Sequence, residues 1–449
     1  MKVEDIDYFM PISQGVHGIR IYNCTITSIR KLVEFTSLQE FEIDASTVIK
    51  EVALGYDNAS SFKLKECIIA ADENDDDEKE VQVIDFNIEK LATIAHCIES
   101  ITFKNDHVSN LGYLTNFNSL TALKFDRVTA RLRSFLPISA QIEALGFMES
   151  IIKNRSKIRH FKNLEVLKID ANTQKESIKD FKTLFPLKNQ LKKFDFWEFS
   201  DSRIKNLALI DQFTALESVF ILHASKKVAQ RVFSLPSLKK LSIKIRTKKA
   251  QTFNVEALKN IEELYIENEN QITLNGLANL QHLKVVSLKD YCKANDIHNI
   301  KNLQYLKINE AININELPEI DTLTKLEIDV NEDYKVLSLE QISNQKELSI
   351  KGTNTITLGD LPQLQDIDIS SIFPKRIDFL NGLPNLEKLC LENNCLTAIQ
   401  GLDKLTNLKM LNLSENYKIK SIDGLANLKS LEHLNLYENE ILDVIILNL

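Results

Sequence analysis

The sequence predicts an α/β solenoid, a curved array of about 20 short coils whose strands form one parallel sheet on the concave side. Two observations predict this fold. The first is an apolar triplet, L-x-x-L-x-L, that recurs along almost the whole chain. The second is the spacing of its copies, which averages about 22 residues. Because one strand and one turn cannot bury their apolar face alone, neighbouring copies must cover one another.

The clearest copies lie near the C-terminus, as LEKLCL (386–391), LKMLNL (408–413) and LEHLNL (431–436). Less regular copies start at residues 16, 38, 59, 81, 98, 120, 142, 164, 191, 216, 238, 261, 283, 303, 323, 345 and 364. Alternation within each triplet predicts a short strand with one buried face. Apolar residues at three-residue spacing in the rest of each copy favour 3-10 turns or irregular convex segments.

The repeats predict a simple domain organisation. Residues 1–15 contain enough apolar side chains for an N-terminal cap, and residues 16–449 are expected to form a single solenoid. Its repeats are divergent over 16–260 and regular over 261–449. The last residues continue the repeat pattern, so either the final half-turn closes the core or this C-terminal edge packs on another molecule.

Three copies extend the triplet to L-x-x-L-x-L-x-x-N-x-L, with Asn394, Asn416 and Asn439 at the amide position. In this pattern the chain resembles the leucine-rich repeat family. The resemblance implies that these side chains bond backbone groups inside the turns and form a ladder. Four other copies carry Asn or Cys at this position, namely Cys24, Cys67, Asn172 and Asn331. The I-x-G-L turns at 399–402 and 422–425 resemble the 22-residue subclass of internalin-type surface proteins and phosphatase-regulating leucine-rich proteins.

The chain is acidic, with a formal net charge of −8. A nucleic-acid partner requires a basic face that neutralises phosphates, so this balance argues against nucleic-acid binding. No run reaches the ~18 apolar residues of a membrane span, and the start, MKVEDIDYFM, lacks the apolar core of a signal peptide. We therefore expect a cytoplasmic protein that binds no membrane, and secretion without a signal peptide stays open.

We find no motif that binds nucleotide phosphates, holds catalytic zinc or exposes a nucleophilic serine. His96 adjoins Cys97, and Cys390 could approach His433 across the sheet, but neither pair has a third group to orient the histidine. We therefore expect no enzymatic activity, no cofactor and no metal. The acidic run ADENDDDEKE at 71–80 lacks the glycine of a calcium loop and is expected to be a solvated outer loop.

The third, fifth and seventh positions of each copy should point away from the core, and most of them are polar. Exceptions occur at Met148, Trp197, Phe220 and Leu222, and Trp197 is the only tryptophan. Large apolar side chains on a sheet face indicate an interface hot spot. The alternative is a one-residue register shift, which would turn Trp197 inward, because the copies that start at 164 and 191 are 27 and 25 residues long.

These observations predict a monomeric, non-catalytic module that binds a protein partner on its concave face. The expected contacts are Met148, Lys168, Asp170, Asp195, Trp197, Phe220, Leu222, Lys240 and Tyr265. Two alternatives stay open. One is a secreted effector or enzyme regulator that acts by binding a host or phosphatase-like enzyme. The other is a structural protein that associates with itself through its C-terminal edge.

Overall fold

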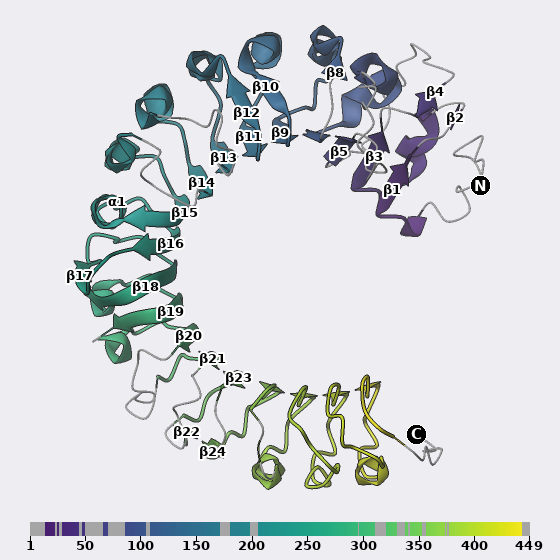
Figure 1. Cartoon of the computed structure of the whole chain (residues 1–449), viewed down its shortest axis with the longest axis vertical. Coiled ribbons are helices and arrows are strands. Elements are labelled where there is room, and N and C mark those ends of the chain that lie inside the picture. The colour runs from purple at the N-terminus through teal and green to yellow at the C-terminus, as the bar shows by residue number, and fades with distance from the viewer. Residues whose placement is uncertain are drawn as a thin grey trace. The chain divides into compact units, whose positions relative to one another are not determined.

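The computed structural model describes residues 14–22, 25–26, 29–44, 47–49, 66–70, 86–104, 108–170, 180–197, 205–294, 296–309, 320–329, 337–339, 342–352, 356–372, 374 and 377–441 (Figure 1). The chain divides into two compact units, Met1–His223 (unit 1) and Ala224–Leu449 (unit 2). Most of the predicted N-terminal cap and the acidic run at 71–80 lie outside the described residues. The single solenoid over 16–449 stays a prediction.

Unit 1 is built on a parallel sheet to which each successive coil contributes one strand. In register order the strands are β1 (Gly18–Ile21), β3 (Glu40–Asp44), β5 (Glu66–Ala70), β7 (Ser100–Lys104), β9 (Ala122–Asp126), β11 (Ala144–Met148), β13 (Val166–Asp170), β14 (Lys193–Trp197) and β15 (Ser218–Ser225). Within unit 1 this sheet lies on the inner side of the coils and the 3-10 helices lie on the outer side (Figure 1).

Two rows of apolar side chains run beneath this sheet, one from each inward position of the strands. The first row is Phe41, Cys67, Ile101, Leu123, Leu145, Leu167, Phe194 and Val219. The second row is Ile43, Ile69, Phe103, Phe125, Phe147, Ile169, Phe196 and Ile221. All of these side chains are at most 3% exposed. The alternation predicted from the triplets is therefore confirmed, and these rows form the core of unit 1.

The outer layer of unit 1 consists of short paired strands and 3-10 helices. The strands are β2 (Thr25–Ile26) with β4 (Val48–Ile49), β6 (Phe86–Asn87) with β8 (Val108–Ser109), and β10 (Thr129–Arg131) with β12 (Ile151–Lys153). The 3-10 helices are η2 (Arg30–Glu34), η3 (Ile88–Cys97), η4 (Leu111–Asn116), η5 (Leu132–Ile138), η6 (Arg155–His160), η7 (Phe181–Leu187) and η9 (Leu207–Gln212). Three-residue spacing explains them, since Phe117 N–H donates to Leu114 O at 3.0 Å and Leu120 N–H to Phe117 O at 3.1 Å.

The third and fourth predicted copies, with starts at 59 and 81, are wrong. β5 aligns Glu66 with Glu40, so the third copy starts near residue 64, and β5 pairs directly with β7. Phe86, expected at an inward sheet position, lies in the outer strand β6 instead. Cys67 is a buried strand residue opposite Phe41 rather than a turn residue. The error arises because outer strands alternate as inner strands do, so the pattern cannot separate them.

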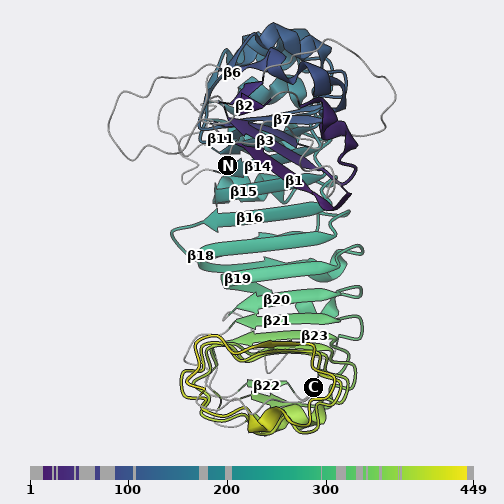
Figure 2. The ribbon, with the colours of Figure 1, turned by 90° about the vertical axis from the view of Figure 1, so that its right-hand side faces the viewer.

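Unit 2 repeats the same architecture. Its sheet strands are β16 (Lys240–Arg246), β18 (Glu263–Asn275), β19 (Val285–Ala294), β20 (Tyr305–Asn309), β21 (Lys325–Asp329), β23 (Glu347–Lys351), β25 (Asp366–Asp368), β26 (Lys388–Cys390), β27 (Met410–Asn412) and β28 (His433–Asn435). All consecutive pairs are parallel. Figure 2 shows β16, β18, β19, β20, β21 and β23 side by side.

The outer layer of unit 2 contains short strands and one α-helix in addition to the predicted 3-10 turns. It contains β17 (Gln251–Asn254), β22 (Leu337–Leu339), β24 (Ile356–Leu358), η10 (Leu277–Asn279), η11 (Ile297–Asn299), η13 (Asp378–Gly382) and η14 (Asp423–Leu425). It also contains the α-helix α1 (Lys226–Val232). Ser225 Oγ accepts the Val228 N–H at 3.4 Å, and this N-cap favours an α-helical start over a 3-10 turn.

The amide ladder implied by the family resemblance is present in unit 2. Asn416 Oδ1 accepts the N–H groups of Asn394 and Leu396 at 3.0 Å each. Asn394 Oδ1 accepts the Ile372 N–H at 2.8 Å, which continues the ladder by one coil. Asn439 Nδ2 donates to carbonyls of its own coil and the preceding one. The other turn positions, Cys24, Asn172 and Asn331, lie outside the described residues.

Candidate functional site

The outward face of the unit 1 sheet exposes two large apolar side chains. Trp197 at the end of β14 is 41% exposed, and Met148 at the end of β11 is 42% exposed. In the same β14 strand Phe194 and Phe196 are buried in register with β13. The alternative of a register shift that turns Trp197 inward is therefore wrong. The unusual length of these coils therefore leaves the strand register unchanged.

Trp197 packs against an aromatic neighbour on the next strand. Its ring stacks on Phe220 of β15, with 4.2 Å between ring centroids and 28° between ring planes. Phe220 lies opposite Asp195, so the contact runs diagonally between neighbouring strands. Offset aromatic pairs of this kind hold each other's orientation. The pair is therefore a preformed apolar surface that stays partly exposed to solvent.

Charged side chains border the aromatic pair. Asp195 is only 8% exposed, and its carboxylate lies 3.6 Å from Lys168 Nζ and 3.8 Å from Lys193 Nζ. The two lysines keep this nearly buried carboxylate paired, while their own side chains stay about half exposed. An apolar centre with a charged border is the usual composition of a protein–protein interface.

The structure brings seven of the nine predicted contacts together on four neighbouring strands of unit 1. They are Met148 on β11, Lys168 and Asp170 on β13, Asp195 and Trp197 on β14, and Phe220 and Leu222 on β15. We call four of them, Met148, Trp197, Phe220 and Leu222, the apolar patch. Phe220 and Leu222 are half-buried, because neighbouring side chains cover part of each. The other two predicted contacts, Lys240 and Tyr265, belong to unit 2.

In unit 2 these two residues contact each other and a shared carboxylate. Lys240 Nζ lies 2.5 Å from Glu263 Oε2 and 5.3 Å from the centre of the Tyr265 ring. The Tyr265 hydroxyl donates to the same Glu263 oxygen at 3.1 Å. Burial, followed by this hydrogen bond, raises the pKa of Tyr265 to about 12. Each group already has a partner within unit 2.

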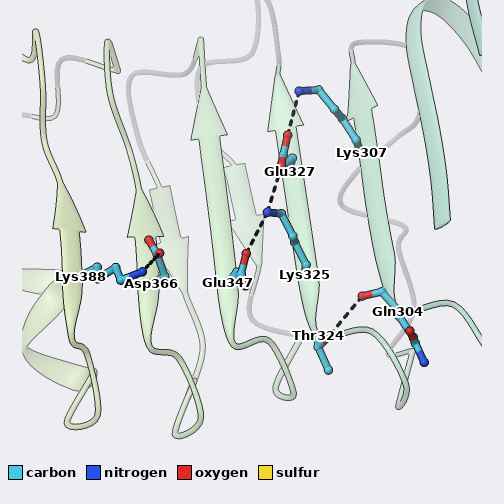
Figure 3. Close-up of polar contacts among 8 residues, drawn as sticks. All are labelled: Gln304, Lys307, Thr324, Lys325, Glu327, Glu347, Asp366 and Lys388. Carbon is cyan, nitrogen blue, oxygen red and sulfur yellow. Dashed lines mark hydrogen bonds and ion pairs between the residues drawn. The ribbon is translucent and has the colours of Figure 1, made fainter. Parts of the chain in front are cut away.

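The same pairing continues across the unit 2 sheet, as Figure 3 shows. Lys307 Nζ lies 2.8 Å from Glu327, and Lys325 Nζ lies 3.6 Å from Glu327 and 2.8 Å from Glu347. Further along, Lys388 Nζ lies 3.6 Å from Asp366. We call Lys307, Glu327, Lys325 and Glu347 the ion-pair ladder. The ladder was not predicted from the sequence, although lysine and glutamate at aligned outward positions of successive coils were a usable signal.

The ladder shifts the pKa values of its members. Burial raises the pKa of Glu327, but the hydrogen bond and charge of Lys307 outweigh it, so the net pKa is below its usual value. The pKa of Lys325 is raised, because Glu347 accepts a hydrogen bond from its ammonium group. Both shifts favour the charged forms, so the face stays zwitterionic around neutral pH.

The structure describes both cysteines that the sequence analysis considered for reactivity. Cys97 is buried, and its thiol donates to Ile94 O at 3.0 Å. Cys390 lies on the sheet face opposite Asn412, whereas His433 is aligned with Met410. Within the described ranges, no group of three or more His, Cys, Asp or Glu residues could hold a metal ion. No helix in this same part of the chain is long and apolar enough to cross a membrane.

Comparisons with known proteins agree with this fold. A family model described as Leucine Rich repeats (2 copies) matches residues 406–448. The human volume-regulated anion channel subunit LRRC8A is 27% identical over 231 residues, which are 46% of this chain and 26% of the relative. The subunit LRRC8D of Rattus norvegicus is 28% identical over 233 residues, 46% of this chain and 24% of the relative. The chain thus spans about a quarter of the length of these relatives.

A solved structure resembles the chain over nearly its whole length. The structure titled as a TLR13–ssRNA13 complex has a TM-score of 0.50 and 14% identity, and the match covers 95% of this chain and 79% of that one. At this identity the likeness concerns the fold alone. The repeated coils, the amide ladder of Asn394 and Asn416 and the family match lead to one conclusion. The chain has the leucine-rich repeat fold.

Proposed function

We propose that the chain is a non-catalytic module that binds a protein partner on the sheet face of unit 1, at the apolar patch. Leucine-rich repeat solenoids in general present their concave surfaces for binding. The observation that supports this site is the stacked Trp197–Phe220 pair, which leaves a large aromatic side chain 41% exposed on a sheet. Buried aromatic side chains contribute much of the binding free energy of protein complexes.

The surroundings of the patch suit a protein partner. The strands beneath it are held by the buried rows of the core, so binding requires little ordering of the backbone. Lys168 and Lys193 border the patch and are available to pair with acidic groups of a partner, while Asp195 keeps them oriented. Asp170 ends the strand between those of Met148 and Trp197 and adds a carboxylate to the same border.

The two predicted contacts in unit 2 take a secondary place in this proposal. Lys240 and Tyr265 share Glu263, so a partner that used either would have to replace an existing contact. We therefore propose that the apolar patch supplies most of the affinity. The absence of catalysis is part of the proposal, and it is supported by the burial of Cys97 and by the alignment of His433 with Met410 rather than Cys390.

The test is a binding measurement with matched variants. Partners captured by the wild-type chain are identified, purified and titrated calorimetrically against wild type, Trp197→Ala and Phe220→Ala. We expect each variant to bind about 30-fold more weakly or worse, as a hot-spot truncation of about 2 kcal/mol implies. The identity of the partner also separates a scaffold from a regulator, because a regulator would bind an enzyme and change its rate.

The matched control is Met410→Ala. Met410 is 42% exposed on the unit 2 sheet, so the control removes an equally exposed apolar side chain outside the patch. Its affinity should stay within about twofold of wild type, since surface truncations outside hot spots change little. A partner that binds both patch variants as tightly as wild type would contradict the proposed site.

A further inference from the structure

Unit 1 contains a cavity on the side of the coil away from the patch. It has a volume of about 370 Å³ and is lined by residues of β7, β8, β9, β10, η4, η5 and β12. The strands explain its position. Among the described residues β8 pairs with β6 and β10 pairs with β12, but β8 and β10 do not pair with each other. The outer layer is therefore open between β8 and β10, and the cavity lies at this opening.

The floor of the cavity is aromatic. Phe103, Phe125 and Phe135 line it and are 2–4% exposed. Their ring centroids lie 5.2 Å apart for Phe125–Phe135, 5.4 Å for Phe103–Phe125 and 5.9 Å for Phe103–Phe135. Rings packed at these distances form a rigid apolar surface. The half-buried side chains of Val108 and Val128 continue this surface to the mouth.

Two cationic side chains line the cavity close to each other. Arg131 and Lys153 line the cavity, and they lie directly opposite each other on β10 and β12. Both are exposed, and neither makes a hydrogen bond or an ion pair with a described residue. Like charges directly opposite on paired strands destabilise a sheet. In the ion-pair ladder, by contrast, Lys307 lies opposite Glu327 and the charges cancel.

We propose that this cavity binds a small free amphipathic anion, a carboxylate with an apolar body. The carboxylate would pair with Arg131 and Lys153 and remove their mutual repulsion, and the apolar body would cover the phenylalanine floor. The cavity volume lies within the range of about 300–1,000 Å³ that is usual for small-molecule sites. This site is separate from the apolar patch, so it can fail without affecting the proposed protein-binding function.

The probe is dodecanoate, titrated calorimetrically into the full-length protein below its micelle concentration. We expect Arg131→Gln and Lys153→Gln each to weaken binding about tenfold, because each removes one hydrogen bond to an ionised group. Ser134→Trp, at an exposed residue of the lining, should also weaken binding by filling the mouth. Dodecanol, which has the same body and no charge, should bind at least about tenfold more weakly than dodecanoate.

Two controls and a vesicle assay make the test decisive. Arg133→Gln and Lys157→Gln remove nearby cations that do not line the cavity, and both should bind dodecanoate as wild type does. Circular dichroism melting should show that all variants are folded. Absence of dodecanoate binding by wild type, equal losses in the control variants, or equal binding of dodecanol would each overturn the proposal. Flotation of the protein with phosphatidylglycerol vesicles, without binding of free dodecanoate, would also overturn it in favour of a membrane surface.

Discussion

The outward faces of the two sheets differ, although the same type of coil produces both. On unit 2, lysines and carboxylates of neighbouring strands pair with one another, as Lys307 does with Glu327 and Lys325 with Glu347. On unit 1, the strands from β11 to β15 carry the apolar patch, where Trp197 stacks on Phe220. From β16 to β23 the unit 2 face pairs its charges, whereas this part of the unit 1 face leaves a cluster of apolar side chains exposed to solvent. On the unit 2 sheet Met410 of β27 is exposed without the aromatic neighbour that Trp197 has.

The difference shows that the side chains at outward positions can vary without changing the fold, because the fold depends on the apolar inward positions. Inward positions must be apolar in every coil, because each coil is covered by its neighbours. Outward positions satisfy strand pairing equally well with a lysine, a glutamate or a tryptophan. An exposed tryptophan on such a sheet is therefore not required by the repeat pattern, and binding is the explanation we favour.

The cores of the two units also differ. The substitution with the largest expected effect on stability tests this difference. Phe125 stacks between Phe103 and Phe147 at centroid distances of 5.4 and 5.2 Å, whereas unit 2 adds an amide ladder to a mostly aliphatic core. Phe125→Ala should destabilise unit 1 by about 3–5 kcal/mol, because it leaves a cavity in a rigid stack. Because Trp197 is the only tryptophan, its fluorescence during urea unfolding reports on unit 1.

Phe125→Leu is the matched control. It keeps an apolar side chain of intermediate volume, so the midpoint of its fluorescence transition should lie between those of wild type and Phe125→Ala. If both variants unfold at the same urea concentration as wild type, the aromatic stack is not what stabilises unit 1.

In unit 2 the comparable test is Asn416→Ala. It removes the side-chain acceptor of the Asn394 and Leu396 N–H groups and the donor to the Leu391 carbonyl. Leaving these buried groups unpaired should cost about 3 kcal/mol, since each unsatisfied group costs about 1–3 kcal/mol. Urea unfolding followed by far-ultraviolet circular dichroism measures the loss. Asn407→Ala, at an exposed amide, should change stability by less than about 0.5 kcal/mol. Equal losses in the two variants would contradict a structural role of the ladder.

A double substitution replaces the aromatic pair of the unit 1 face with a lysine and a glutamate, the residue types that pair on the unit 2 face. Trp197→Lys combined with Phe220→Glu should destabilise unit 1 by about 1–2 kcal/mol, because it removes the aromatic stack and places a carboxylate opposite Asp195. The same change should weaken partner binding by about 30-fold or more, as loss of the hot spot implies. Urea unfolding measures the change in stability, and calorimetric titration of the same protein measures the change in affinity. Binding that survives this exchange would show that the two faces are equivalent for the partner.

Sequence patterns predicted the fold well where one pattern had one structural meaning. The alternation in LKMLNL corresponds to β27, and Asn416 occupies the ladder position that the consensus assigns to it. Sequence patterns failed where an inner and an outer strand share the same alternation. The copy that starts at 81 is wrong because the outer strand β6 presents Phe86 inward as a sheet strand would. The α-helix α1 was missed because a local cap at Ser225 determines it.

For the surfaces, position within the repeat sufficed to orient Trp197, because register is determined by the buried residues beside it. The ion-pair ladder left a signal in the sequence, since its lysines and glutamates occupy aligned outward positions of successive coils, but the structure was needed to show which of them pair. The cavity beside Arg131 and Lys153 was beyond sequence reasoning, since it depends on two outer strands that do not pair. Such features arise from the packing of the coils and leave no pattern within a single repeat.

The smallest expected effect concerns the ladder itself. Lys307→Gln removes the partner that lowers the pKa of Glu327, and it should destabilise the protein by about 0.5–1 kcal/mol near neutral pH. A carboxylate whose folded pKa is lowered contributes stability above its unfolded pKa and loses it as the pH falls through the folded pKa. The difference between wild type and variant should therefore disappear in acid, and it should shrink in salt. Urea unfolding across this pH range measures it.

Lys409→Gln provides the comparison for this last effect. Lys409 pairs with Glu387 at 2.9 Å, but the two side chains are 45% and 42% exposed, against 29% and 23% for Lys307 and Glu327. Solvent screens the more exposed pair more strongly, so Lys409→Gln should cost less than Lys307→Gln. If the two losses are equal, or if the Lys307→Gln loss persists in acid, the ladder does not stabilise unit 2 through its charges. The contrast between a self-paired face and a binding face would then lack its energetic basis.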